Sequence, residues 1–327
     1  MRTLKEIYKK ALGLESITIE ESLKLYTDAP LQELIYIASE LRQLHNPGKN
    51  VGWIIDRNIN LTNICFSQCR FCNFCRTTNS EEAYVTGLEE YRQKIDELFE
   101  LGGDQILLQG GMNPDLGISF YADLFSTLKK MYPRLKLHAL GPPEIAYLSR
   151  KEKLSYAEVL RKLIDSGLDS LPGAGAEILS DRVRKEVSPA KATTDEWLGV
   201  MREAHRLNLP TSATMMYGHA ETIAERMEHL VKLRDLQNGK PEGTYGFITF
   251  IPWPFQDEGT VLREKKGVRS SYNSPGYIRL IALSRIALNN IKNIQASVLT
   301  VGRDTGMLSL NAGANDVGSV MIEENVV

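Results

Sequence analysis

The sequence predicts an α/β protein whose main part is a TIM-type (β/α)8 barrel, complete or slightly open, preceded by a helical collar. From residue 51 onward, short apolar segments typical of buried strands alternate with longer amphipathic segments typical of helices, which is the pattern of parallel βαβ units. Eight such strands can be placed before the end of the chain, and a TIM-type barrel has eight. No Ser/Gly-rich linker divides residues 51–327, so we expect a single barrel domain there.

Residues 1–50 are expected to be helical. Thr18 and Glu21 form a capping box, in which each side chain satisfies a backbone N–H group at the start of a helix. Apolar residues then recur at helical spacing, at Leu31, Leu34, Ile35, Ala38 and Leu41. We interpret this segment as a lid or collar packed on the barrel; a separate helix pair that binds a partner is the alternative.

The barrel strands are expected where short apolar runs are followed by turn-rich loops. They are predicted at residues 58–62, 105–108, 136–140, 168–171, 211–216, 245–251, 294–298 and 316–322. The helix after the first strand has one apolar face, formed by Tyr84, Leu88, Tyr91, Ile95 and Leu98. Ser155 and Thr193 begin two further helices, since glutamate follows each of them three residues later. In such a barrel the loops after the strands lie at one end and carry the chemistry.

All four cysteines lie between positions 65 and 75. Cys65, Cys69 and Cys72 follow the first strand with Cys-x3-Cys-x2-Cys spacing, and thiolates are the ligands that iron–sulfur clusters take from proteins. The ferredoxin spacing, which has a fourth cysteine three residues on and then a proline, is absent. Three ligands leave one iron of a [4Fe–4S] cluster open to a further ligand. We expect Cys75 to be a bystander, because a fourth thiolate would close that iron.

Two other uses of cysteine are less consistent with this pattern. A structural zinc site usually takes two pairs of ligands separated by a dozen or more residues, whereas these cysteines form one short run. A disulfide framework distributes its cysteines through a small secreted chain, and the charged N-terminus does not read as a signal peptide. The spacing is instead the signature of the radical S-adenosylmethionine (SAM) superfamily, which the chain resembles.

The composition limits the classes of partner. Hydrophobic residues make up 43% and charged residues 24% of the 327 residues, as in ordinary globular proteins. A net charge of −2, from 39 basic and 41 acidic residues, provides no basic field for nucleic acid. No apolar run approaches the ~20 residues of a membrane helix. We therefore expect no nucleic-acid or membrane partner and a reducing cytoplasmic location, which an oxygen-sensitive cluster also requires.

Several residues near the predicted strand ends suit a SAM site. Gln109, Gly110 and Gly111 follow the second strand, where glycines let backbone carbonyls approach the SAM ammonium closely. Glu177, after the fourth strand, suits a ribose hydroxyl, and Arg182 or Arg184 suits the SAM carboxylate. A plain turn for the glycines and surface salt bridges for the charged residues are the alternatives.

Other candidates for the chemistry are His138, His219 and Asp316, each near a predicted strand end. We expect them to face the mouth of the barrel, in substrate binding or proton transfer; structural hydrogen bonding is the alternative for each histidine. The remaining histidines lie on helical segments and are expected to be structural. The aromatic residues at 251–255 suit either a rigid wall for a flat or sugar-bearing ligand or simple packing.

Longer motifs extend the resemblance over nearly the whole chain. The chain resembles the cyclic dehypoxanthine futalosine synthases, radical SAM enzymes of the futalosine route to menaquinone. The motifs that carry the resemblance lie at residues 56–74, 107–114, 138–145, 170–179, 215–219, 251–256 and 313–318. The sister enzymes aminofutalosine synthase and the deazaflavin-precursor (FO) synthase share the cysteine motif and remain alternatives. A non-catalytic iron–sulfur electron-transfer protein is a more remote alternative.

The resemblance implies a reaction. With SAM on the open iron, a 5′-deoxyadenosyl radical would abstract the C4′ hydrogen of the ribose of dehypoxanthine futalosine. The carbon radical would add to the benzoate ring, and loss of an electron and a proton would restore aromaticity. The protein would orient the reacting atoms and exclude water. An electron donor such as flavodoxin or ferredoxin is the implied partner.

The chain departs from the family pattern at three places. Cys75 stands where relatives usually carry tyrosine or serine, so the family implies no fourth cluster ligand. Met112 replaces a more usual histidine. Relatives are also expected to continue past the position of Val327 into a closing helix.

Overall fold

The computed structural model describes residues 2–320, 322 and 323. Its strands are β1 (Gly52–Ile54), β2 (Asp56–Asn60), β3 (Gln105–Gln109), β4 (Lys136–Ala139), β5 (Thr211–Tyr217), β6 (Phe247–Pro254), β7 (Asn293–Ile294) and β8 (Asp316–Ser319). Every pairing between these strands is parallel. The α/β class with parallel strands, predicted from the alternation of apolar segments, is therefore confirmed.

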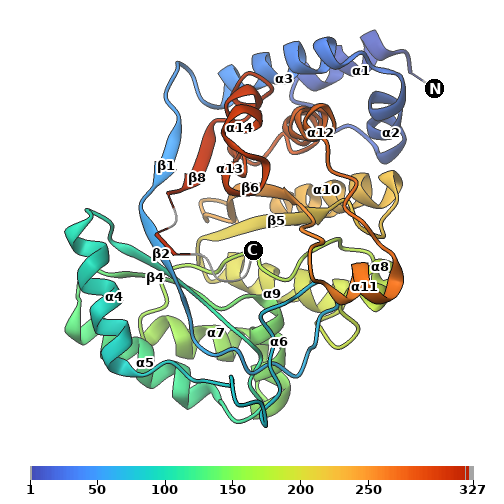
Figure 1. The fold of residues 1–327 in the computed structure, drawn as a ribbon. Helices are drawn as coiled ribbons and strands as arrows, with labels where there is room; N and C mark the ends of the chain where they lie inside the picture. The colour runs from blue at the N-terminus through green and yellow to red at the C-terminus, as the bar shows by residue number, and fades with distance from the viewer. Residues whose placement is uncertain (1, 321, 324–327) are drawn as a thin grey trace.

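Helices separate the strands and precede the first one (Figure 1). They are α1 (Leu4–Leu12), α2 (Ile19–Asp28), α3 (Leu31–His45), α4 (Leu88–Glu100), α5 (Ile118–Met131), α6 (Pro142–Glu152), α7 (Tyr156–Asp165), α8 (Asp181–Val187), α9 (Thr194–Arg206), α10 (Ile223–Asn238), α11 (Val261–Lys266), α12 (Ser274–Ala287), α13 (Val298–Val301) and α14 (Arg303–Leu310). The predicted capping boxes at Thr18, Ser155 and Thr193 are all present. Within the described part of the chain, no helix is both long and apolar enough to cross a membrane.

The strands form three sheets, with the orders β1-β8, β2-β3-β4 and β5-β6-β7. Only Ile55 separates β1 from β2, so the first two sheets continue into each other through the chain. Single bridges between the sheets join His138 to Ser170, Leu171 to Thr211, and Gln295 to Asp316. Strand pairing therefore follows the circular order of a TIM-type fold, while continuous ladders exist only inside the three sheets.

Three predicted strands are clearly shorter than expected, and the last of them, predicted at 316–322, ends at Ser319. The segment predicted at 168–171 is reduced to two bridges, because Pro172 follows it and has no N–H group with which to extend a ladder. The segment predicted at 294–298 becomes the two-residue strand β7, and Val298 already begins helix α13. Short apolar runs do not distinguish strand from helix by periodicity alone.

Strand β6 runs further than the predicted 245–251 and includes Pro252 and Pro254. It pairs with β5 along its whole length but with β7 only at Thr249 and Phe250. The two prolines lie beyond the reach of β7, so the ladder on that side does not need the N–H groups that they lack.

The N-terminal helices form a collar and not a lid over the mouth. Helix α3 packs on α12, and α2 packs on α10 and α12. In Figure 1 these helices lie at the top, whereas β2 runs downward into the cysteine-containing loop. Asn46, after α3, donates a side-chain hydrogen bond to the carbonyl of Lys292, just before β7 begins. The collar therefore covers the outside of the fold and the end where strands start.

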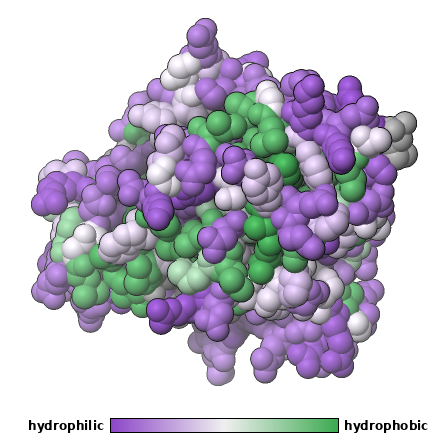
Figure 2. Space-filling view, turned by 90° about the horizontal axis from the view of Figure 1, so that it is seen from above, coloured by the Kyte–Doolittle hydropathy of each residue, from purple (hydrophilic) through white to green (hydrophobic). Residues whose placement is uncertain are grey.

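The same upper end is shown face-on in Figure 2, where hydrophobic residues gather within a mostly hydrophilic surface. Helices α13 and α14 lie at this end in Figure 1. Their exposed apolar side chains include Leu299 and Leu308.

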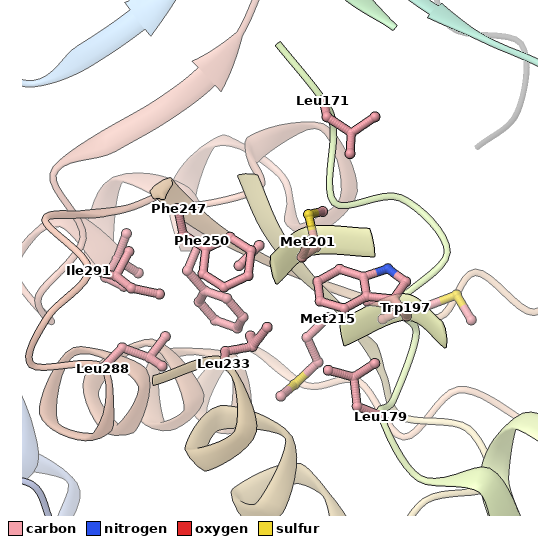
Figure 3. Close-up of a cluster of buried hydrophobic side chains, with 14 of the residues drawn as sticks. Leu171, Leu179, Trp197, Met201, Met215, Leu233, Phe247, Phe250, Leu288 and Ile291 are labelled. Atoms are coloured by element: carbon pink, nitrogen blue, oxygen red, sulfur yellow. The ribbon is translucent and has the colours of Figure 1, made fainter. Parts of the chain in front are cut away.

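A large part of the core lies between β5, β6 and the helices outside them (Figure 3). Trp197 of α9 is fully buried, and its ring stacks on Phe247 of β6 with centroids 6.2 Å apart. Met215 of β5, Phe250 of β6 and Leu233 of α10 pack in the same cluster. Burying side chains of this size is the dominant favourable term in folding. Alternate residues of β5 and β6 therefore face these outer helices, which leaves the residues between them to face the inside of the barrel.

Candidate metal and cofactor site

The loop that carries the cysteines closes on itself directly after β2. The Cys65 N–H donates to the carbonyl of Arg76 (3.0 Å), and the Arg76 N–H donates to the carbonyl of Asn63 (2.8 Å). A parallel bridge also joins Ile64 to Arg76. These bonds fix the two ends of the loop to each other and leave the residues between them to surround a ligand.

The three predicted metal ligands are free thiols within this closed loop. Cys69 is buried, and Cys65 and Cys72 are half-buried. The Cys72 N–H donates to the Cys69 carbonyl (3.1 Å), so a turn brings these two residues together. Burial raises the pKa of the Cys69 thiol to about 11, and the ammonium of Lys191 opposes that rise. Three soft thiol donors in one closed loop fit an iron–sulfur cluster.

Each ligand of a four-iron cluster binds a different iron, so the sulfurs around a cluster are more widely spaced than those around one ion. Among residues 2–320, 322 and 323, no three His, Cys, Asp or Glu side chains lie close enough together to hold a single metal ion. The wider spacing of the three thiols is the one that a cluster requires.

Cys75 has a different environment from the other three. Its thiol donates to the backbone carbonyl of Cys65 at 3.2 Å, and burial raises its pKa to about 11. The Cys75 thiol therefore acts as a hydrogen-bond donor that helps to close the loop. The prediction that it is a bystander to the cluster stays a prediction.

The glycines after β3 allow a close approach to the base of the cysteine loop. A Cβ atom on Gly111 would lie 2.1 Å from the carbonyl oxygen of Ile64 and 2.8 Å from the Cβ of Cys65. A Cβ atom on Gly110 would lie 2.9 Å from the Thr62 carbonyl oxygen. The Gly111 N–H donates to that same carbonyl (2.7 Å). Gly111 therefore lies beside Cys65, and Gln109 and Gly110 lie against Leu61 and Thr62 just before the cysteines. A role for these three residues at SAM stays a prediction.

The cysteine loop is also attached to α8 and α11. The Arg70 N–H donates to the carbonyl of Val187, the last residue of α8, at 2.8 Å. The Leu262 N–H of α11 donates to the Arg70 carbonyl at 2.9 Å. Segments far apart in the sequence thus position the loop between Cys69 and Cys72.

Polar side chains lie on the inner face of the strands near this loop. Asn58, Leu107 and His138 are in register on β2, β3 and β4, and a bridge joins His138 to Ser170. Side chains in register on neighbouring strands point to the same side. The next residue, Ile59, is fully buried, and we assign it to the outer face because barrel helices present apolar surfaces to the strands. The inner face therefore carries an amide, an imidazole and a hydroxyl where most barrels are filled with bulky apolar side chains.

Glu177 follows the bridged segment at Ser170 and Leu171 and has a left-handed backbone conformation, with φ of +40°. Its buried carboxylate lies 2.9 Å from Lys191 Nζ and 3.4 Å from an Arg184 nitrogen. Burial opposes ionisation, but the charges of Lys191 and Arg184 outweigh it and hold the pKa of Glu177 below its ordinary value. A role for Glu177 at a ribose hydroxyl stays a prediction.

Arg184 differs from the expectation that it would meet a cofactor carboxylate. Its side chain is buried, and its guanidinium donates to the carbonyls of Gly175, Ala176 and Ala192 at 3.1, 2.7 and 2.8 Å. It therefore holds the turn before Glu177 to the segment after α8, and its donors are used within the protein. Sequence alone did not indicate this because each of the carbonyls belongs to a loop.

Arg182 is 53% exposed and forms an ion pair with Glu225, with 2.5 Å between the closest nitrogen and oxygen. It also donates to the carbonyl of Ala220 at 2.9 Å. These contacts match the surface salt bridge that was the alternative for this residue. A role at the cofactor stays a prediction.

The two candidate histidines have different surroundings. Nδ1 of His138 lies 2.7 Å from the hydroxyl of Ser170, and burial lowers its pKa to about 4, so the ring is neutral at neutral pH. The side chain of His219 is fully buried; Nε2 lies 3.0 Å from the Met216 carbonyl, and Nδ1 accepts from the Ala220 N–H at 2.7 Å. Both ring nitrogens of His219 serve the turn after β5, which indicates a structural role. His138 lies on the inner face and remains a candidate.

Asp316 is not at the mouth of the barrel. It is the first residue of β8 and pairs with Gly52, the first residue of β1. Both lie beside a pocket of about 500 Å³ near the start of β7, with His45 and Lys292 in its lining. Because all strands are parallel, this is the end opposite to the cysteine loop. The prediction of Asp316 as a mouth residue was wrong because the last strand begins, and does not end, at this residue.

Two charged residues of the site did not emerge from the sequence. Lys191 lies against Glu177 and over the ring of Phe71, 5.4 Å from its centroid. Glu144, in the first turn of α6 after β4, has a buried carboxylate oxygen without a hydrogen-bond partner among the described residues. Burial raises the pKa of Glu144 to about 7, although Lys191 acts in the opposite direction. The sequence feature that could have identified Glu144 is its place shortly after a predicted strand, in a helix that begins with Pro142 and Pro143.

Two family models match the chain. The model of the radical SAM superfamily matches residues 59–233, and the model of the CofH/MqnC C-terminal region matches residues 244–327.

Two curated relatives share one name. Cyclic dehypoxanthine futalosine synthase of Streptomyces coelicolor is 41% identical and covers 99% of this chain and 80% of its own length. The protein of that name from Halalkalibacterium halodurans is 38% identical and covers 98% and 85%. A further relative is 5-amino-6-(D-ribitylamino)uracil–L-tyrosine 4-hydroxyphenyl transferase 1 of Methanosarcina acetivorans, which is 38% identical and covers 94% and 80%.

Two solved structures resemble the fold. Methylornithine synthase has a TM-score of 0.72 at 20% sequence identity and covers 98% of this chain and 88% of its own. HydG, a maturase of the [FeFe]-hydrogenase, has a TM-score of 0.75 at 18% identity and covers 97% and 68%. At these identities the resemblance concerns the fold.

Proposed function

The chain belongs to the radical SAM superfamily, and we propose that within it the protein converts dehypoxanthine futalosine to cyclic dehypoxanthine futalosine in menaquinone biosynthesis. The observation that carries this proposal is its 41% identity to a synthase of that name over 99% of the chain. That similarity spans the cysteine loop, the inner face of the strands and the C-terminal region, so it includes every part of the site described above.

Members of the superfamily use a [4Fe–4S] cluster and SAM, which together supply the hydrogen-abstracting radical chemistry when bound. In this chain Cys65, Cys69 and Cys72 would hold the cluster. The close approach of Gly110 and Gly111 places the end of β3 beside that loop, where its carbonyls suit the SAM ammonium. Glu177 suits a ribose hydroxyl. These residues bind and orient; none of them needs to transfer a proton.

The inner face of the strands is suited to a polar substrate. Asn58, His138 and Ser170 offer hydrogen bonds to the hydroxyls of a sugar, and Trp253 and Met216 are in register on β6 and β5 further along the same face. A neutral His138, fixed by Ser170, can donate or accept without adding charge. Enclosure by strands on all sides would keep water and other hydrogen donors away from the reacting carbon.

We propose that the three sheets act as one barrel, complete or slightly open, in which single bridges at Ser170, Leu171 and Gln295 are the joins. Residues 1–50 are the collar outside it, and residues 51–327 are the barrel domain. The reductant is proposed to be a flavodoxin- or ferredoxin-type protein, and the location the reducing cytoplasm. The four unpaired thiols support a reducing compartment.

The proposal is tested by anaerobic reconstitution with iron, sulfide, SAM and a reductant, followed by addition of dehypoxanthine futalosine. Mass spectrometry should detect 5′-deoxyadenosine and a product two hydrogens lighter than the substrate. SAM cleavage without consumption of this substrate would overturn the substrate assignment and leave the reaction class intact.

The 38% identity to the 4-hydroxyphenyl transferase favours a second candidate, in which the 4-hydroxyphenyl group of L-tyrosine is transferred to 5-amino-6-(D-ribitylamino)uracil. The same reconstituted protein should be offered these two compounds in a parallel reaction. A coupled product in this reaction, with dehypoxanthine futalosine unchanged in the other, would establish the second candidate in place of the first.

A further inference from the structure

A buried ammonium group lies against the cysteine loop. Nζ of Lys191 is 2.9 Å from a carboxylate oxygen of Glu177 and 5.4 Å from the ring centroid of Phe71. Phe71 stands between Cys69 and Cys72 in the sequence. The Lys191 side chain is only 17% exposed and that of Glu177 only 6%. The cation is therefore enclosed between an anion on one side and the cluster-binding loop on the other.

The position of Lys191 is determined by the same scaffold as that of the cysteines. Its N–H donates to the carbonyl of Ser188 (3.0 Å), and the N–H of Ser188 donates to the carbonyl of Arg184 in α8 (2.8 Å). Arg184 in turn donates to the carbonyl of Ala192 (2.8 Å). The end of α8 also accepts the hydrogen bond from Arg70 of the cysteine loop. Hydrogen bonds to the same helix, α8, therefore position both Lys191 and the cysteine loop.

The charges beside the cysteine loop come from a small set of groups. Nζ of Lys191 lies 2.9 Å from one carboxylate oxygen of Glu177, and an Arg184 nitrogen lies 3.4 Å from the other. One buried carboxylate is therefore shared by two cations, of which Lys191 is the one that lies over Phe71 of the cysteine loop. Glu144, at the start of α6, is a further acidic group near Lys191.

We propose that Lys191 is a positioning residue whose fixed positive charge, beside the loop between Cys69 and Cys72, stabilises the reduced state of the cluster bound there. Reduction adds one electron from an external reductant to the cluster, so the cluster becomes more negative by one charge while no bond to the protein forms or breaks. A nearby cation stabilises the reduced cluster more than the oxidised one, because the reduced cluster carries one more negative charge. The effect is larger in a site that excludes water. Lys191 would therefore raise the reduction potential of the cluster. This inference rests on the cluster of the proposed function but not on the identity of the substrate.

The cation–π contact gives Lys191 a second role in the same arrangement. An ammonium near an aromatic ring attracts its face, so Lys191 holds Phe71 in place while Glu177 holds Lys191. The contact with Lys191 therefore holds Phe71 of the loop between Cys69 and Cys72. The hydrogen bond from the Arg70 N–H to the Val187 carbonyl attaches the same loop to α8. Arginine at position 191 would keep the charge and stack on the ring, whereas methionine would keep the apolar stem and lose the charge.

The test compares the midpoint potentials of reconstituted full-length variants. The parent, Lys191→Met, Lys191→Arg and Lys185→Met are loaded anaerobically with iron and sulfide, analysed for iron content, and titrated with dithionite while the reduced cluster is followed by electron paramagnetic resonance. Lys185 is an exposed residue of α8, so Lys185→Met removes the same charge from a solvated position, where screening is strong. We expect a lower midpoint potential for Lys191→Met, and values at or near the parent's for Lys191→Arg and Lys185→Met.

The other possible outcomes of this experiment either support the inference or overturn it. An unchanged potential in a fully loaded Lys191→Met protein would overturn it, and so would an equal shift in Lys185→Met. If Lys191→Met takes up no cluster while Lys191→Arg does, a positive charge at this position is needed for the negatively charged cluster and the inference stands. If neither variant takes up a cluster, the lysine is needed for its shape and the inference fails. A parent chain without a cluster would instead overturn the proposed function, and iron analysis detects this before any titration.

Discussion

The thiol groups of Cys69 and Cys75 lie six positions apart in one loop, yet their environments differ. The Cys69 thiol is buried beside Lys191 and lies 3.3 Å from the hydroxyl of Ser67. The Cys75 thiol instead donates to the carbonyl of Cys65 at 3.2 Å. A thiolate is the metal-binding form of cysteine, and the hydrogen bond of Cys75 to a backbone carbonyl uses the protonated form.

Replacing any one of Cys65, Cys69 and Cys72 by alanine is expected to remove a cluster ligand. Iron content, the broad visible absorbance of the cluster and 5′-deoxyadenosine formation should all be lost. Cys75→Ser is the matched control and should retain all three near parent levels, because a hydroxyl can also donate to the Cys65 carbonyl. A serine variant without a cluster, or alanine variants that still cleave SAM, would contradict this assignment.

At the scale of elements, the join between β3 and the cysteine loop depends on backbone proximity. The Leu61 N–H donates to the Gln109 carbonyl at 2.9 Å, and the Gly111 N–H donates to the Thr62 carbonyl at 2.7 Å. These bonds continue the β2–β3 ladder past the end of both strands. The two backbones are too close for a side chain at Gly111, so the loop after β3 and the loop after β2 act as one unit.

Gly111→Ala should therefore impair cluster binding more than it impairs folding. The added methyl group would lie under 3 Å from backbone atoms of Ile64 and from the Cβ atom of Cys65, and the base of the loop would have to move. We expect a substantially lower iron content after reconstitution, measured against Gly87→Ala, where an added Cβ would meet nothing within 4 Å. Equal iron contents in the two variants would show that the close approach is not needed.

At the scale of the whole molecule, one buried residue connects the collar helix, an outer helix and the strand starts. Arg285 of α12 donates to the carbonyls of Gly313, Ile291 and Lys292 at 2.9, 3.2 and 3.0 Å and to the side chain of Asn315 at 2.8 Å. A Cβ atom on Gly313 would lie 3.0 Å from the Cβ of Ala38 in α3. The end of the fold opposite to the cysteines is therefore a packed, hydrogen-bonded structural region.

Arg285→Met is expected to lower the free energy of unfolding by about 3–5 kcal/mol, because it leaves several buried acceptors unpaired. Urea unfolding of the chain without its cluster measures this effect. Arg303→Met is the control, since Arg303 is exposed at the start of α14 and surface changes usually stay within about 0.5 kcal/mol. A loss below about 1 kcal/mol for Arg285→Met would show that water or relaxation satisfies these carbonyls.

The sequence by itself determined those features that depend on local spacing. The cysteine motif, the capping boxes at Thr18, Ser155 and Thr193, and the alternation of apolar segments all act over a few residues. They were enough to predict parallel strands and a cysteine loop next to the loop after β3, because the loops after parallel strands share one end of the fold. The assignment of Cys65, Cys69 and Cys72 as cluster ligands stays a prediction. The family resemblance, which the relatives confirm, then indicated the reaction.

Only the tertiary structure decided which charged residues reach the site. Arg184 and Lys191 are both cations that follow Glu177, but carbonyls from two loops surround the first, whereas the second lies against the cysteine loop. Asp316 reads as a strand-end residue in the sequence, yet it begins β8 at the far end of the barrel. The reason is physical: burial, strand direction and the partners of a charge arise from segments that are distant in sequence, and no local pattern encodes them.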